Sequence, residues 1–161
     1  MPRSWPTRSR DRSTTTTGAN RLLTPRRDVV LDTGPLVGYL NARDQWHARS
    51  AATWPTLVDR LVTTEAVVTE ACHLMLRSGA PASVPVELLL SVEVPILPLE
   101  TSLQHRAVRL MRDYAALPMD YADASLVSLA EALGISRVFT TDRRGFETYR
   151  LPGSKPFEVV S

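Results

Sequence analysis

The chain contains a single cysteine, Cys72, among its 161 residues. One thiol excludes an internal disulfide and any metal site built from several cysteines. Its place in an apolar helical pattern predicts a buried, unreactive side chain. No apolar run approaches the roughly 20 residues of a membrane-spanning helix, and the N-terminal segment lacks the apolar core of a secretory signal. We therefore expect a cytoplasmic protein with no membrane role.

The composition is that of an ordinary globular protein, with 43% hydrophobic and 22% charged residues. The length suffices for one domain with a real core and is too short for two. The net charge of +2 is unevenly distributed. Residues 1–27 contain seven arginines and one acid, Asp11, which gives them +6 and leaves −4 for the rest. The positive charge therefore belongs to residues 1–27, and it is no evidence that the rest of the chain acts on nucleic acid.

Residues 1–27 combine scattered arginines with three prolines and a Ser/Thr run at 13–17. This composition offers little to bury and predicts a disordered basic leader. An organellar transit peptide, an upstream extension of a bacterial reading frame and an arm that attracts RNA are all compatible with it. The folded domain is expected to span residues 28–161.

Short apolar runs alternate with amphipathic segments throughout the domain. The runs predict strands at 29–31, 61–63, 95–98, 137–140 and 157–160. The amphipathic segments predict helices at about 44–58, 65–78, 84–90, 101–116, 120–133 and 142–147. Pro35 suits a first helical turn directly after the first strand, and Thr64 suits a helix cap. The alternation predicts an α/β fold with a parallel sheet covered on both faces.

Five acidic residues are placed where such a fold can bring them together. Asp32 and Asp142 directly follow predicted strands, and ligands of open α/β sheets bind beyond the carboxyl ends of the strands. Asp120 and Asp123 are three positions apart, so they share a face at the start of a helix. Glu70 lies in the middle of a helix among apolar neighbours, where a charge needs a partner.

Clustered carboxylates repel one another unless a cation neutralises them. Oxygen ligands without a His or Cys set favour Mg²⁺ or Mn²⁺. Such a site suits the attack of water on a phosphodiester. Each acid alone also has a structural explanation: a turn for Asp32, a helix cap for Asp120 or Asp142, a first-turn acid for Asp123 and plain exposure for Glu70. Only the set as a whole favours catalysis.

The chain resembles the PIN-domain nucleases, in particular the VapC-type toxins of bacterial toxin–antitoxin pairs. The resemblance extends from residue 28 to about 160 and is carried by four segments: Val-Leu-Asp-Thr at 30–33, Val-Thr-Glu at 68–70, Met-Asp-Tyr-Ala-Asp-Ala-Ser-Leu-Val at 119–127 and Phe-Thr-Thr-Asp-Arg-Arg-Gly-Phe at 139–146. The last two segments are fairly specific. One departure is Gly34-Pro35, where the usual motif favours a small polar residue.

The resemblance implies a three-layer α/β/α sandwich with a central, mainly parallel sheet, and an endoribonuclease that depends on Mg²⁺ or Mn²⁺. It implies a homodimer inhibited by a cognate antitoxin whose segment lies across the active-site groove. The implied catalytic residues are Asp32, Glu70, Asp123 and Asp142, with Asp120 as an additional acid and Thr33 and Thr140 as supporting hydroxyls. Of these, Asp32, Asp123 and Asp142 would hold metal. The implied products carry a 3′-hydroxyl and a 5′-phosphate.

RNA also requires cationic contacts to its phosphates. Arg143 and Arg144 directly follow the last acid and are the best placed for this role. The series Arg106, Arg109 and Arg112 is more typical of a solvated helix face. Trp46, Trp54 and Tyr121 are interpreted as residues of core or interface packing and His47 as non-catalytic, although an aromatic ring is also able to stack on a base.

Three other functions are alternatives to this one. A PIN-like scaffold without turnover would bind RNA or protein, but the complete acidic set argues against it. A phosphatase with an aspartyl nucleophile needs a second Asp two residues after the first, and that position is Gly34. A phosphorylated receiver module would need an acid pair and a late lysine that the chain lacks in the required places.

Overall fold

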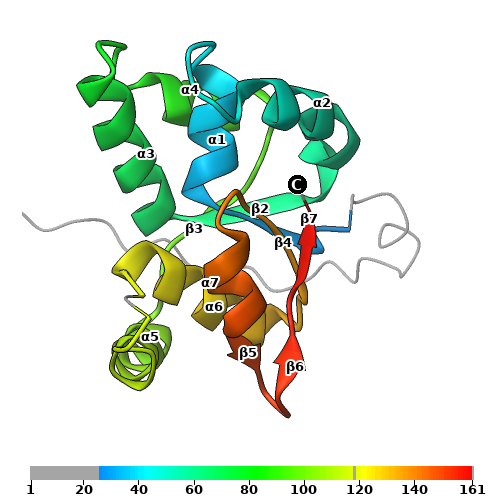
Figure 1. Ribbon diagram of the computed structural model, residues 1–161, viewed down its shortest axis with the longest axis vertical. Helices are drawn as coiled ribbons and strands as arrows, with labels where there is room; N and C mark the ends of the chain where they lie inside the picture. The colour runs from blue at the N-terminus through cyan, green and yellow to red at the C-terminus, as the bar shows by residue number, and fades with distance from the viewer. Residues whose placement is uncertain (1–25, 118, 161) are drawn as a thin grey trace, which may run out of the picture.

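The computed structural model describes residues 26–117 and 119–160. Its centre is a five-stranded sheet in the order β3–β2–β1–β4–β7, with every neighbouring pair parallel (Figure 1). The strands are β1 (Val29–Leu31), β2 (Leu61–Thr64), β3 (Ile96–Leu97), β4 (Arg137–Phe139) and β7 (Glu158–Val160). The predicted strands are thus confirmed, although β3, β4 and β7 are shorter than the apolar runs.

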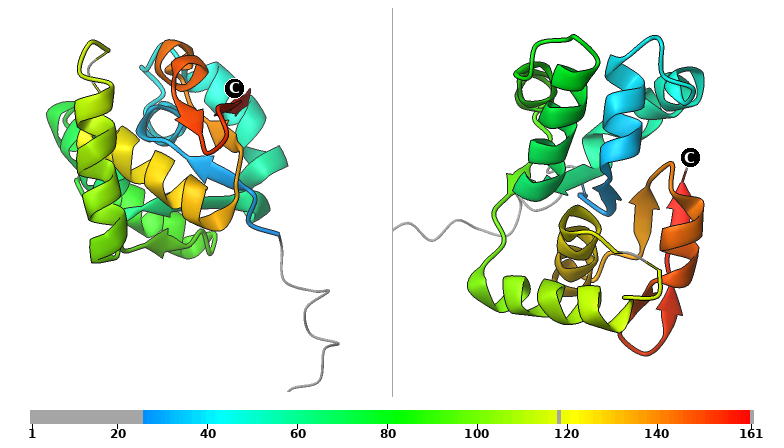
Figure 2. Two further views of the ribbon diagram at one scale, coloured as in Figure 1. Left: turned by 90° about the horizontal axis from the view of Figure 1, so that it is seen from below. Right: turned by 60° about the vertical axis from the view of Figure 1, so that its left-hand side comes forward.

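Helices cover both faces of this sheet. One side carries α1 (Thr33–Leu40), α2 (His47–Leu57), the short 3-10 helix Val58–Arg60, α3 (Glu65–Arg77) and α4 (Val84–Ser91). The other side carries α5 (Thr101–Asp113), α6 (Tyr121–Leu133) and α7 (Arg143–Thr148). Figure 2 shows these two helical layers on either side of the strands. The three-layer α/β/α fold is therefore confirmed.

The central strand β1 explains why both layers form. Val30 packs into the hydrophobic core shared with α5 and α6, whereas Val29 and Leu31 pack into the second core, under α1 to α4. All three side chains are fully buried. Successive residues of a strand point to opposite faces, so a strand that is apolar at every position needs cover on both.

Several sequence predictions need correction. Cys72 is half-buried rather than buried, because it lies on the flank of α3 beside the core. The helix predicted at about 44–58 begins at His47, since Oδ1 of Asp44 accepts a hydrogen bond from the backbone of Trp46 and forms a turn there. A two-stranded antiparallel hairpin, β5 (Arg150–Leu151) and β6 (Lys155–Pro156), was not predicted.

The predicted disorder of the leader falls on residues that lie almost entirely outside the described part. Within that part, Arg27 donates hydrogen bonds to the carbonyl oxygens of Val58 and Glu93, at 3.1 and 2.9 Å. Asp28 pairs with Arg60. Among the described residues, no helix is both long and apolar enough to cross a membrane.

The register of the sheet decides where the predicted site lies. Leu31 pairs with Phe139, so the residues that follow them, Asp32 and Thr140, emerge side by side at the carboxyl edge. Thr63 pairs with Ile96, and the next residues lead from β2 into α3 at the same edge. The connections after β1 and β4 carry predicted acids and hydroxyls, and the connection after β2 leads into the helix that carries Glu70, so these segments meet at one edge.

Candidate active site

Asp32 is the buried centre of the site, with a side chain that is 6% exposed. It follows β1 and caps α1, where its Oδ1 accepts a hydrogen bond from the backbone of Thr33 at 2.7 Å. Its Oδ2 accepts one from Oγ1 of Thr140 at 2.6 Å. Both carboxylate oxygens are thus oriented by groups at the ends of β1 and β4.

Glu70 reaches the same edge from the middle of α3. Its Oε2 accepts a hydrogen bond from Oγ1 of Thr33 at 2.6 Å, which supplies the partner that a half-buried charge requires. Thr33 therefore contacts two of the acids: its hydroxyl donates to Glu70 and its backbone N–H donates to Asp32.

Asp120 and Asp123 occupy the start of α6. Asp120 is exposed and caps the helix, accepting a hydrogen bond from the backbone of Asp123 at 2.9 Å. Asp123 is half-buried, and its Oδ2 accepts a hydrogen bond from the hydroxyl of Tyr149 at 3.1 Å. Capping is thus a real role of Asp120, as the structural interpretation expects.

Asp142 lies beyond β4 and is exposed. It caps α7, since its Oδ1 accepts a hydrogen bond from the backbone of Gly145 at 3.1 Å. Its own backbone N–H donates to Oγ1 of Thr140 at 2.9 Å. The same threonine hydroxyl therefore connects the acid after β1 with the acid after β4.

Asp32 and Asp123 are both affected by the charges of other acids in the set. Burial raises the pKa of Asp32 to about 6, against the hydrogen bonds from Thr140 and Thr33, and the charges of Glu70 and Asp120 raise it further. Burial raises the pKa of Asp123 to about 8, with further increases from Asp32, Asp120 and Asp142. Burial is the largest cause of both raised pKa values, and the neighbouring carboxylates add to it.

The donor set fits a hard divalent cation in its chemistry, because every candidate ligand is a carboxylate oxygen. The described side chains do not form a complete set of metal ligands. Across residues 26–117 and 119–160, no three His, Cys, Asp or Glu side chains stand in a metal-binding arrangement. Asp32, Asp123 and Asp142 each accept hydrogen bonds that orient the carboxylate, from Thr33 and Thr140, from Tyr149 and from Gly145 respectively.

Comparison with known proteins identifies the family to which the chain belongs. Residues 29–151 match the family described as PIN domain. The chain belongs to the PIN-domain family. No curated protein matches it in sequence.

Solved structures agree with this assignment at the level of the fold. VapC20 of Mycobacterium tuberculosis, described as a toxin that cleaves the sarcin–ricin loop, superposes with a TM-score of 0.67 at 19% identity, over 71% of this chain and 89% of that one. VapBC2 of Rickettsia felis, solved with a DNA fragment of its promoter, gives 0.61 at 15% identity, over 83% and 98%. PAE2754 of Pyrobaculum aerophilum gives 0.50 at 19% identity, over 83% and 89%.

Tyr149 is a residue of this PIN domain that sequence reasoning missed. Its ring is buried and packs edge-on against Tyr114 and Phe146, with centroids 5.1 and 5.3 Å away. This packing fixes the hydroxyl against Asp123. The charges of Asp123 and Asp142 help to raise the pKa of the phenol, after burial, so the group remains a hydrogen-bond donor.

The departure at Gly34 also has a structural explanation. A Cβ atom at this position would lie 2.0 Å from Oγ1 of Thr141. The side chain of Thr141 therefore occupies the space that a small polar residue at position 34 would need. A hydroxyl is still present beside the turn, but it comes from the loop after β4 instead of the turn after β1.

The cationic residues differ in how available they are. Arg143 is exposed and pairs with Glu147, at 2.8 Å on the surface of α7. The side chain of Arg144 is also exposed. Arg106 forms a two-pronged ion pair with Glu131 that joins α5 to α6, which agrees with a structural role for that arginine.

The aromatic residues named from the sequence fall into two groups. Trp54 is buried and stacks on Tyr39, with centroids 4.6 Å apart, as predicted for a packing residue. Trp46 is half-buried, and His47 hydrogen-bonds the carbonyl oxygen of Gly38 through Nδ1. Tyr121 is not a core residue, because it is 42% exposed.

Proposed function

We propose that this PIN domain is an endoribonuclease dependent on Mg²⁺ or Mn²⁺ and acts as the toxin of a toxin–antitoxin pair. The observation that carries the proposal is the acidic site around Asp32, where Asp123 and Glu70 lie within one electrostatic field at the carboxyl edge of the sheet. Membership of the PIN family supports nuclease chemistry over the phosphatase and receiver alternatives.

Asp32, Asp123 and Asp142 would hold the cation, because they come from three different elements that meet at this edge. When bound, the cation polarises a phosphoryl oxygen, lowers the pKa of water and offsets developing charge. Thr140 keeps the carboxylate of Asp32 oriented, and Tyr149 does the same for Asp123. Asp120, as the cap of α6, positions the helix turn that carries Asp123.

Glu70 is the residue we assign to the attacking water. The hydroxyl of Thr33 holds Oε2, which leaves Oε1 to accept a hydrogen bond from water and to take its proton. The water oxygen bonds to phosphorus and the bond from phosphorus to the 3′ oxygen breaks. The 3′ oxygen takes up a proton from solvent water, and Glu70 returns the proton it took to solvent. The products carry a 3′-hydroxyl and a 5′-phosphate.

The partners follow from the same proposal. Arg143 and Arg144 lie just beyond Asp142 and would contact phosphates of the RNA, with Arg143 exchanging its exposed pair with Glu147 for a phosphate. The structural similarity to VapBC2 supports a cognate antitoxin as inhibitor. A homodimer as the acting form is part of the proposal and is what the resemblance to VapC-type toxins implies. An RNA substrate would place this action in the cytoplasm.

The proposal is tested by inducing the protein in bacteria and sequencing newly formed RNA ends, together with cleavage by the purified protein. We expect growth arrest, new 5′-phosphate ends at defined positions, and cleavage in vitro that stops when EDTA removes the cation. Purified protein that binds Mn²⁺ but cuts no RNA in a mixed pool would instead support the scaffold without turnover.

A further inference from the structure

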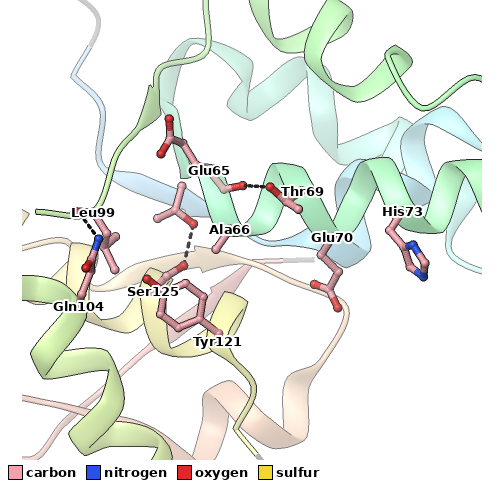
Figure 3. A pocket seen from close by; sticks show the side chains of 10 residues that line it. Glu65, Ala66, Thr69, Glu70, His73, Leu99, Gln104, Tyr121 and Ser125 are labelled. Carbon is pink, nitrogen blue, oxygen red and sulfur yellow. Dashed lines mark hydrogen bonds between the residues drawn. The ribbon is translucent and has the colours of Figure 1, made fainter. Parts of the chain in front are cut away.

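A cavity of about 600 Å³ lies beside the acidic site, between α3, α6 and the start of α5 (Figure 3). Its volume is within the range of pockets that bind small molecules, roughly 300–1,000 Å³. Glu70 lines this cavity and also receives the hydroxyl of Thr33 beside Asp32. The cavity is therefore continuous with the proposed catalytic site.

An exposed aromatic ring forms one wall of the cavity. Tyr121 is the first residue of α6, directly after Asp120 and two positions before Asp123. Figure 3 shows its ring below Ser125, between Gln104 and Glu70. Most large apolar side chains of this domain are buried, whereas this ring remains 42% exposed. A flat face that is open and adjacent to the acids is suited to stacking.

The polar walls of the cavity are acidic or neutral. Glu65 and Glu70 contribute carboxylates and His73 an imidazole, and neither lysine nor arginine is among the described residues that line it. The two carboxylates favour a neutral group over a phosphate in this cavity. Gln104 donates from Nε2 to the carbonyl oxygen of Leu99 at 2.9 Å, which leaves its Oε1 and its second N–H for a ligand.

We propose that this cavity binds one unpaired nucleobase of the RNA, stacked on Tyr121, next to the phosphodiester that is cut. This inference rests on the proposed function. A base is neutral and flat, and its exocyclic amino and ring N–H groups donate to carboxylate and amide oxygens such as those of Glu65 and Gln104. With the base on Tyr121, its sugar and phosphate lie toward Asp120 and Asp123. The base at this one position then selects the RNA.

The proposal implies that the RNA is single-stranded or looped at the cut. A base inside a duplex is paired and stacked on its neighbours, so it cannot enter a side cavity without leaving the helix. Aromatic stacking tolerates any base, whereas the hydrogen bonds of Gln104 and Glu65 distinguish among them.

The test compares Tyr121→Leu with Tyr121→Phe on a random-sequence library of single-stranded RNA, with steady-state kinetics on one oligonucleotide taken from it. Leucine keeps an apolar side chain but removes the ring, while phenylalanine keeps the ring. We expect Tyr121→Leu to raise KM about tenfold or more. We also expect it to flatten the base preference at one position beside the cut, because a base without the ring is no longer held against Gln104 and Glu65. The Phe variant should resemble the unmodified protein.

Leu133→Ala, at the other end of α6 and also exposed, is the matched control and should change neither quantity. Melting temperatures establish that the variants fold. If Tyr121→Leu does not fold, Gln104→Ala replaces it and should change the base preference.

Unchanged KM and preference in Tyr121→Leu would overturn the inference, as expected if the cavity serves a protein partner. An equal loss in the Phe variant would also overturn it. Absence of cleavage by the unmodified protein contradicts the proposed function itself.

Discussion

Thr140 donates a hydrogen bond from Oγ1 to Oδ2 of Asp32 at 2.6 Å, across 108 positions of sequence. The same Oγ1 accepts the backbone N–H of Asp142 at 2.9 Å. One buried hydroxyl therefore joins the end of β1 to the loop after β4, and with it two of the acids assigned to the metal. The geometry of the site depends on this threonine as much as on the carboxylates.

Replacing this hydroxyl should weaken metal binding without unfolding the protein. Thr140→Val keeps the shape of the side chain but removes the donor to Asp32, and outer-shell partners of metal ligands typically contribute 10- to 100-fold to affinity or activity. We expect a loss of about this size in Mn²⁺ affinity measured by calorimetry. Thr140→Ser, which keeps the hydroxyl, should lose much less, and equal losses in both variants would contradict the role of the hydroxyl.

Tyr149 should act on activity through Asp123. Tyr149→Phe keeps the buried ring but removes the hydroxyl that donates to Oδ2 of Asp123. We expect cleavage to fall about tenfold, as for other outer-shell partners.

Tyr114→Phe is the matched control, because its hydroxyl accepts only the backbone N–H of Arg150 among its described hydrogen bonds. It should lose about 1 kcal/mol of stability and keep its activity. If both variants retain full activity, Tyr149 does not position Asp123.

The contact between Gly34 and Thr141 predicts a rescue. Gly34→Ala places a Cβ atom 2.0 Å from Oγ1 of Thr141, so the turn that carries Asp32 and Thr33 must shift. We expect a loss of about 1–3 kcal/mol in the free energy of unfolding, as for other overpacked sites, together with weaker cleavage. Adding Thr141→Ala should restore much of the stability. A double variant as unstable as the sum of the two single changes would refute this explanation.

The five strands of the central sheet and the expected placement of the acids were accessible from sequence. A strand covered on both faces is apolar at every position, so runs such as Val29–Leu31 stand out, and the carboxyl ends of parallel strands meet at one edge. The position of Glu70 was predicted as part of the set. Thr33 was expected to support the acids, but its particular partner could not be predicted. The packing of α3 on α1 decides that its hydroxyl reaches Glu70.

The features that were missed depend on distant packing. Tyr149 reaches Asp123 only because α7 folds back beside α6, and nothing in an aromatic residue after a short helix indicates that contact. The β5–β6 hairpin has strands of two residues each, one of them ending in Pro156, which is too short for an alternating pattern. The exposure of Tyr121 could not be predicted from the sequence, because it depends on the cavity that this residue lines.

The raised pKa values predict how the stability of the metal-free protein depends on pH. Asp123 titrates at about 8 and Asp32 at about 6 in the folded protein, against about 3.9 for an aspartate in an unfolded chain. A raised folded-state pKa gives stability that is complete below about pH 4 and is lost as the pH rises through 6 and then 8.

In EDTA, the free energy of unfolding of the unmodified protein should therefore fall between about pH 5 and 8.5. The fall should be larger than in Asp123→Asn, by on the order of 2 kcal/mol. Denaturant melts at several pH values measure this difference. Parallel curves for the two proteins would contradict the clustering of charge. Added Mn²⁺ should reverse the fall, because the cation binds the deprotonated carboxylates.

The most direct test of the central claim is Mg²⁺-dependent RNA cleavage by Asp32→Asn, compared with Asp59→Asn, an exposed acid outside the site. The asparagine keeps the shape of Asp32 but removes the charge at the buried centre of the acidic set. We expect Asp32→Asn to abolish cleavage and growth arrest while keeping the fold, and Asp59→Asn to cleave like the unmodified protein. Unchanged cleavage by Asp32→Asn would contradict the claim that this edge of the sheet is the active site.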